Sequence, residues 1–153
     1  RKTAAKNSNP FTPAVNLYFA LEAALEIMQA EGLEPIFARH SRHRAAAHAA
    51  MKAIGLPLFA AEGHGSPAIT AVAPNGMDAE QLRKAVKERY DILLAGGQDH
   101  LKGKVFRIGH LGFVCDRDVL TAVAAIESVL QSIGMHTGTM GAGVSAASDV
   151  LSQ

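Results

Sequence analysis

The apolar residues of the first third of the chain recur at helical spacing. In the first segment they stand every three or four positions, at Val15, Leu17, Tyr18, Leu21, Leu25 and Met28. Thr12 and Pro13 precede this run and offer a hydroxyl cap followed by a proline at the first helical position. Gly32 is a typical helix end. A second helical pattern covers residues 34–54 and ends at Gly55.

From residue 56 onward the apolar runs become shorter and richer in β-branched residues. They predict strands over residues 56–59, 68–73, 92–94 and 105–108, and helices over residues 78–90 and 117–133. The order α-α-β-β-α-β-β-α predicts an α/β fold of the α+β type. Two leading helices precede a small, mainly antiparallel sheet of about four strands, with helices packed on one face. The tail, residues 135–153, is rich in Gly, Ala and Ser and is expected to be flexible unless a partner orders it.

Composition narrows the class of protein. Hydrophobic residues make up 48% of the 153 positions, and the formal net charge is only +1, so charge gives no reason to expect binding to nucleic acid or to a membrane surface. No apolar run approaches the roughly 20 residues that span a bilayer. Cys115 is the single cysteine, which excludes an internal disulfide and fits a reducing, cytoplasmic compartment. The first predicted helix is more apolar than this core requires, which suits packing against another domain or subunit.

Arg107 is a permanent cation inside an otherwise apolar strand, between Phe106 and Ile108. A buried charge without a partner is very costly, so its guanidinium needs water or an anion. The guanidinium fork can grip both oxygens of a carboxylate at once. Two interpretations remain open from the pattern alone: an arginine on the solvent face of a half-buried strand, or a clamp for an anionic substrate.

The other reactive side chains do not form a recognisable catalytic set. His40, His43 and His48 share a predicted helix, but their spacing brings together one pair at best, and we expect a solvated basic face and no metal site. Cys115 lies beside Asp116, a poor setting for a thiolate. No glycine-rich stretch has the spacing of a phosphate loop. From its residues alone, the chain has a candidate anion clamp and no nucleophile, general base or cofactor anchor.

Five motifs together resemble one enzyme family. They are NPFTPAV (residues 9–15), EGLE (31–34), SPAITAV (66–72), LAGG (94–97) and FRIGHLG (106–112). In this order and spacing they resemble the C-terminal part of the class V aminotransferases, pyridoxal-phosphate enzymes of fold type I. The resemblance covers residues 1 to 134 and is greatest to alanine–glyoxylate and serine–glyoxylate aminotransferases. The family includes cyanobacterial proteins named soluble hydrogenase small subunit.

The resemblance assigns roles to individual residues. Arg107 matches the arginine that binds the α-carboxylate of the substrate. Thr12 matches a residue that crosses the dimer interface to the cofactor phosphate of the other subunit. Asn9 falls where many relatives carry a tyrosine with the same task, so its role is doubtful. Gly96 and Gly97 would let the backbone approach the site closely.

The resemblance also implies what this chain lacks. The lysine that forms the Schiff base and the aspartate that pairs with the pyridine nitrogen belong to the large domain, which would precede residue 1. No catalytic residue is therefore expected here, and the chain alone is expected to be inactive and to bind no pyridoxal phosphate. We expect an arm from the large domain over residues 1–12, the small domain over 13–134 and the tail over 135–153.

The intact protein is then expected to be a homodimeric transaminase that moves an amino group from a small amino acid, alanine or serine, to a 2-oxo acid such as glyoxylate. Two alternatives remain. In one, the chain is a stand-alone regulatory or interaction domain in which Arg107 contacts an effector or a surface. In the other, it is an accessory subunit of the kind named soluble hydrogenase, although one cysteine cannot hold a nickel–iron site or an iron–sulfur cluster.

Overall fold

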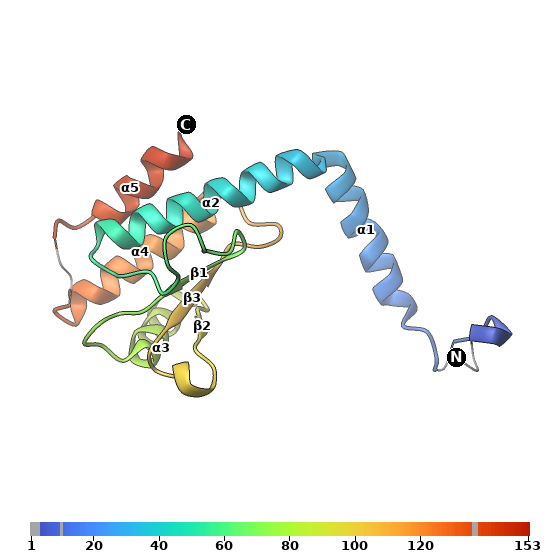
Figure 1. The fold of residues 1–153 in the computed structure, drawn as a ribbon, viewed down its shortest axis with the longest axis horizontal. Coiled ribbons are helices and arrows are strands. Elements are labelled where there is room, and N and C mark those ends of the chain that lie inside the picture. Colours follow the sequence, from blue (N-terminus) through green and yellow to red (C-terminus); the bar gives the residue numbers. More distant parts are fainter. Residues whose placement is uncertain (1–3, 10, 136–137) are drawn as a thin grey trace. The chain divides into compact units, whose positions relative to one another are not determined.

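A computed structural model describes residues 4–9, 11–135 and 138–153 (Figure 1). The chain divides into two compact units, Arg1–Phe37 and Ala38–Gln153. This division falls within the segment that the sequence assigned to one small domain. Residues 1–3 and 10 of the predicted arm, and residues 136–137 of the predicted tail, lie outside the described residues.

The first unit is built on a long helix. A short 3-10 turn, η1 (Ala4–Lys6), precedes α1 (Val15–Glu31), and α2 (Leu33–Ala53) begins in this unit and continues into the second. The predicted start of the first helix is wrong by two residues, because Ala14, not Thr12, is its N-cap and makes no side-chain cap bond. The predicted end is correct. Gly32 has φ +86° and its N–H donates to Met28 O, and α2 starts at the next residue.

The second unit contains a three-stranded antiparallel sheet. Its strands are β1 (Ile69–Val72), β2 (Ala95–Gly96) and β3 (Phe106–Gly109), in the order β1-β3-β2. About four strands were expected. The predicted strand 56–59 is reduced to one bridge between Leu58 and Val72, since Pro57 has no N–H to donate. The predicted strand 92–94 is displaced, and pairing begins at Ala95.

Burial alternates along the strands, so the sheet has one covered face. Thr70 and Val72 on β1, and Phe106 and Ile108 on β3, are buried, while Ala71 and Arg107 between them are only half-buried. The covered face meets the core formed with α2, α3 (Ala79–Tyr90) and α4 (Asp116–Ser132). This arrangement confirms the α/β class and the prediction of helices on one face.

The tail contains a helix that the sequence did not predict. Residues Ala142–Leu151 form α5, which packs on α4, as Figure 1 shows. The buried Glu127 carboxylate of α4 accepts hydrogen bonds from Gly143 N (3.1 Å) and Val144 N (3.2 Å), at the start of α5. A side chain on Gly143 would place its Cβ 2.8 Å from Ile54 Cγ2. The expected flexible segment is therefore, over these residues, a packed helix, and its small residues allow the close approach.

Candidate functional site

Arg107 lies in the middle of β3, on the less buried face of the sheet. It is in register with Ala71 of β1 on one side and with Ala95 of β2 on the other. Its Nε donates to Gly96 O at 3.0 Å. In residues 4–9, 11–135 and 138–153, Arg107 forms no ion pair. A half-buried guanidinium between two alanines, with no counter-ion in the described part of the chain, can accept an anion.

The two glycines beside Arg107 make room for other parts of the protein. A Cβ on Gly97 would lie 2.0 Å from Leu101 O, in the short turn η2 (Asp99–Leu101). A Cβ on Gly96 would lie 2.6 Å from Arg83 Nη1. Arg83 is held in turn by the Leu94 carbonyl at 2.7 Å. These glycines therefore pack against η2 and against side chains of α3, and the approach to the site that the resemblance implies stays a prediction.

The loop that follows β3 is fastened at several points. His110 N donates to Ala68 O at 3.0 Å, and its Nε2 lies 3.0 Å from Thr70 Oγ1. Gly112 N donates to His40 Nε2 at 3.1 Å. Arg39 Nη1 donates to the carbonyls of Gly112 (2.9 Å) and Val114 (3.0 Å). These bonds tie the end of β3 to β1 and to α2, so they fix the strand that carries Arg107.

The start of α4 is held by two side chains of α2. Arg42 Nη2 and His43 Nε2 lie 3.0 Å and 2.8 Å from Asp116 Oδ1. Burial raises the pKa of Asp116, but the hydrogen bonds from His43 and Arg42 outweigh it, so the pKa falls below its usual value. The prediction that the histidines of this helix form part of a solvated basic face was wrong, because His43 is fully buried and His40 is nearly so.

His110 is a buried neutral histidine. Its burial, and then its electrostatic interaction with His43, lower its pKa to about 4. At neutral pH it therefore carries no charge and serves as a hydrogen-bonding link to Thr70. No role was predicted from the sequence for Arg39, His43 or His110. The only available signal was the position of His110 in the FRIGHLG motif, directly after the strand of Arg107.

The two predicted cofactor-phosphate contacts lie in the other unit. Thr12 and Asn9 are exposed and precede α1, outside any helix or strand. The structure describes them separately from Arg107 and so does not test whether they share a site. In the part of the chain that is described, no group of three or more His, Cys, Asp or Glu side chains is placed to hold a metal ion. Within the same residues, no helix combines the length and apolar character needed to cross a membrane.

Comparison with known proteins gives the family. No protein-family model matches the chain. The soluble hydrogenase small subunit of Synechococcus sp. (strain PCC 6716) is 65% identical over 99% of this chain and 40% of its own length. Serine–glyoxylate aminotransferase of Arabidopsis thaliana is 40% identical over 93% of the chain and 36% of its own length. The crystal structure of ureidoglycine–glyoxylate aminotransferase from Bacillus subtilis superposes with a TM-score of 0.88 and 34% identity, over 97% of this chain and 38% of that one.

By sequence and by fold, the chain is a class V aminotransferase relative. It corresponds to the C-terminal domain of this fold and spans about 40% of the length of the soluble hydrogenase subunits of Synechococcus and Anabaena cylindrica that it matches. This family assignment confirms the resemblance drawn from the five motifs. It leaves the role of each residue in the class V site to be tested.

Proposed function

We propose that the intact protein is a pyridoxal-phosphate-dependent transaminase in which Arg107 binds the α-carboxylate of the substrate. The amino donor would be a small amino acid such as alanine or serine, and the acceptor a 2-oxo acid such as glyoxylate. The relatives named as glyoxylate aminotransferases support the reaction class. The observation that carries the proposal is the guanidinium of Arg107, half-buried on the open face of the sheet and without an ion pair in the described residues.

The chain's own part in this reaction is to bind and orient. The Nε bond to Gly96 O takes one donor of Arg107, and its terminal amino groups can grip both carboxylate oxygens. A carboxylate held at two points fixes the direction of the substrate Cα–H bond. The fastened loop after β3 keeps the strand, and with it the guanidinium, in place. When bound, the cofactor supplies the electron sink.

Thr12 and Asn9 are the residues of this chain that would contact the cofactor phosphate. Both are exposed, and Thr12 stands three residues before the first turn of α1, where backbone N–H groups favour an anion. In this proposal they reach the site of a second subunit, so the intact protein is a homodimer. The lysine that binds the cofactor covalently belongs to the large domain. A cytoplasmic location is part of the proposal and rests on the single cysteine.

The test of the clamp is Arg107→Lys in the full-length enzyme. Lysine keeps the positive charge but offers a point contact, so both the binding and the orientation of the carboxylate should suffer. Because charge-assisted hydrogen bonds contribute about 1.5–3 kcal/mol each, kcat/KM with alanine should fall at least about tenfold, and further in Arg107→Ala. Cofactor loading, followed by the visible spectrum, should be unchanged.

Two controls separate a clamp from a structural strand residue. Ethylamine, a donor without a carboxylate, should react almost equally with wild type and variant. Arg89→Lys changes an exposed arginine near the end of α3 and should leave both donors unaffected. If Arg107→Lys lowers kcat/KM equally with alanine and with ethylamine, or with neither, Arg107 has a structural role and the proposed substrate site is wrong.

A second part of the proposal concerns the 153-residue chain by itself. None of its lysines stands in the cofactor-lysine motif of the family, so we expect it to be inactive and to bind no pyridoxal phosphate covalently. Purified chain is mixed with the cofactor, treated with borohydride and analysed by mass spectrometry and visible absorption. A stable reduced adduct on one specific lysine would overturn this expectation.

The names of two relatives suggest a different function. Proteins of Synechococcus and Anabaena cylindrica with 65% and 57% identity are named as soluble hydrogenase subunits. The possible metal ligands of this chain offer a hydrogenase function little support. The chain has one cysteine, and its described residues form no metal-binding group. A stand-alone interaction domain gains no specific support either. The aminotransferase proposal therefore stands as the principal one.

A further inference from the structure

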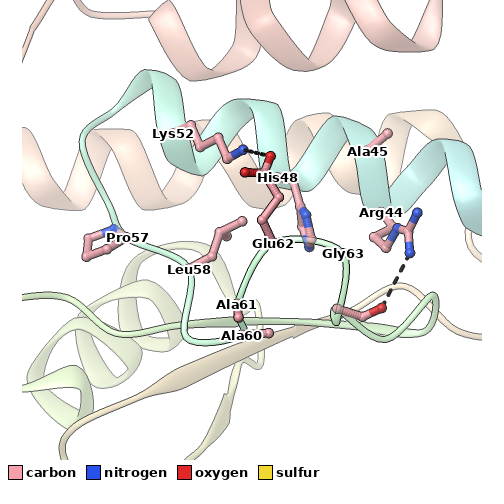
Figure 2. A pocket seen from close by; sticks show the side chains of 11 residues that line it. Arg44, Ala45, His48, Lys52, Pro57, Leu58, Ala60, Ala61, Glu62 and Gly63 are labelled. Atoms are coloured by element: carbon pink, nitrogen blue, oxygen red, sulfur yellow. Dashed lines mark hydrogen bonds and ion pairs between the residues drawn. The ribbon is translucent and has the colours of Figure 1, made fainter.

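Three basic side chains line up on one side of α2 in the second unit. Arg44, His48 and Lys52 stand four residues apart, which places successive residues about 6 Å apart along one side of the helix. Figure 2 shows all three pointing from α2 toward the loop of residues 57–65. Helix and loop line an open cavity of about 480 Å³, the α2 cavity. This volume falls in the range of small-molecule sites, roughly 300–1,000 Å³.

The loop is joined to the helix at both ends of the α2 cavity. Arg44 Nη1 lies 3.4 Å from Gly65 O, and Lys52 Nζ lies 3.7 Å from Glu62 Oε1 (Figure 2). Between these two contacts, the loop backbone passes directly over His48. A Cβ on Gly65 would lie only 2.9 Å from His48 Cε1, so the absence of a side chain lets the loop close on the imidazole. The cavity is therefore bounded by two contacts between loop and helix and by the close approach of Gly65 to His48.

Positive charge in the cavity is incompletely balanced. In the described ranges of the chain, Arg44 has no ion pair, and the side chain of His48 has neither an ion pair nor a hydrogen bond. Lys52 pairs only with Glu62, whose side chain is 95% exposed, and an exposed pair of this kind is weak. The cavity thus has one excess positive charge while His48 is neutral, and two when His48 is protonated.

We propose that the α2 cavity binds a small anion with two negative charges, of the size of sulfate, phosphate or a short dicarboxylate. Arg44 offers its guanidinium fork and Lys52 its ammonium group. His48 lies between them and donates a hydrogen bond when protonated. With a protonated imidazole, the two charges of the ligand match the two excess charges of the site. The cavity is made by α2 and its following loop, so it is separate from Arg107 on β3.

Proton uptake should accompany binding. Burial lowers the pKa of His48, and the charges of Arg44 and Lys52 lower it further. The other titratable groups around it are Glu62 and His64 in the loop and His110 after β3. A bound dianion offsets the repulsion from Arg44 and Lys52 and so favours the imidazolium form. The anion should therefore bind more tightly at pH 6 than at pH 8.

The experiment is calorimetric titration of sulfate into the full-length protein. An Arg107→Ala background removes anion binding at the proposed substrate arginine, and holoenzyme freed of excess cofactor has any cofactor-phosphate site already filled, so a failure here is distinct from a failure of the proposed function. Sulfate keeps both charges throughout this pH range. Malonate should compete with it, and acetate, with one charge, should bind at least about fivefold more weakly.

Paired substitutions give effects of opposite sign. Arg44→Gln and Lys52→Gln should each weaken sulfate binding about fivefold or more, because each removes a charged donor. Glu62→Gln removes the competing carboxylate and should tighten binding about twofold or more. The matched control is the Lys84–Glu88 pair, at 3.8 Å on the exposed side of α3. Lys84→Gln and Glu88→Gln should change nothing.

The role of the imidazole is tested with His48→Gln. In this variant sulfate should bind with equal affinity at pH 6 and pH 8, while the Arg44 and Lys52 contacts remain. Saturable binding with these variant effects supports the site. Absence of saturable sulfate binding overturns the proposal, as does equal weakening by Lys52→Gln and Lys84→Gln. Acetate binding as tight as sulfate binding overturns the assignment of a dianion. An unchanged pH dependence in His48→Gln excludes the proposed role of the imidazole.

Discussion

Helices α1 and α4 have the same length, 17 residues, but opposite surroundings. Seven residues of α4 are buried: Val119, Val123, Ala125, Ile126, Glu127, Val129 and Leu130. None of the residues of α1 is buried, although it is the more apolar of the two helices. Its exposed side chains include Leu17, Tyr18, Phe19 and Leu21, four of five consecutive positions, which at 3.6 residues per turn cannot lie in one narrow stripe.

The difference shows that apolar content alone does not place a helix in a core. The apolar residues of α4 lie mostly along one stripe, which the second unit covers. Those of α1 surround the axis, and an exposed apolar surface of this kind marks an interaction site. The large domain and second subunit that we propose are the candidates to cover it. The contrast can be tested with substitutions and with acid.

The largest effect is expected from Ile126→Ala in α4. Ile126 is fully buried in the core of the second unit, so truncation leaves a cavity and should lower the free energy of unfolding by about 2–5 kcal/mol. Urea unfolding followed by circular dichroism gives the value. Ile27→Ala in α1 is the matched control, because 53% of this side chain is exposed and its truncation should cost less than about 0.5 kcal/mol. An equal loss of unfolding free energy in Ile126→Ala and Ile27→Ala would contradict the contrast between the two helices.

A fall in pH should destabilise the second unit before it affects the first. The pKa of His110 is about 4 in the folded protein and 6.5 in the unfolded chain, so the unfolded state binds a proton that the folded state refuses. The free energy of unfolding should fall as the pH drops from about 6.5 to about 4, by on the order of 3 kcal/mol in total. Asp116, whose folded pKa is lowered, contributes a further loss only near and below its usual value of 3.8.

This loss can be located by hydrogen exchange between pH 7 and pH 5. After correction for the intrinsic exchange rate, amides of β1 and β3 should be less protected at pH 5 than at pH 7, because the low folded-state pKa of His110 makes the folded state less stable at the lower pH. The first 37 residues contain no histidine, so α1 should show no such change. A His110 ring that titrates near 6.5 in the folded protein, by nuclear magnetic resonance, would remove the basis of this prediction.

The smallest effect on stability is expected from Leu21→Gln combined with Leu25→Gln. Both side chains lie exposed on α1, so unfolding of the second unit should change by less than about 0.5 kcal/mol. The apolar surface should nevertheless be smaller, and self-association of the chain and binding of a hydrophobic dye should both decrease. Sedimentation velocity and dye fluorescence measure these. If the unsubstituted chain stays monomeric at high concentration and binds no dye, α1 is not an unpartnered surface.

The sequence predicted the parts of the fold that depend on local patterns. The order of the main helices, strands 69–72 and 106–109, and the Gly32 break follow from apolar spacing and from glycine's access to positive φ. The family was recognisable from five short motifs. Arg107 stood out because a cation in an apolar strand needs an explanation, and its position on the less buried face is consistent with both interpretations drawn from the pattern.

Other features depended on residues far apart in the sequence. Burial of His43 depends on Asp116, 73 positions away, and the tail became a helix because Glu127 of α4 accepts bonds from its first turn. Arg44, His48 and Lys52 are spaced as a basic stripe, but only the fold places Gly65 against His48 and forms a cavity. Local patterns determine which backbone conformations are favoured. Whether a polar side chain is solvated or buried is decided by the partner that the tertiary structure brings to it, since a partner such as Asp116 for His43 offsets part of the cost of burial.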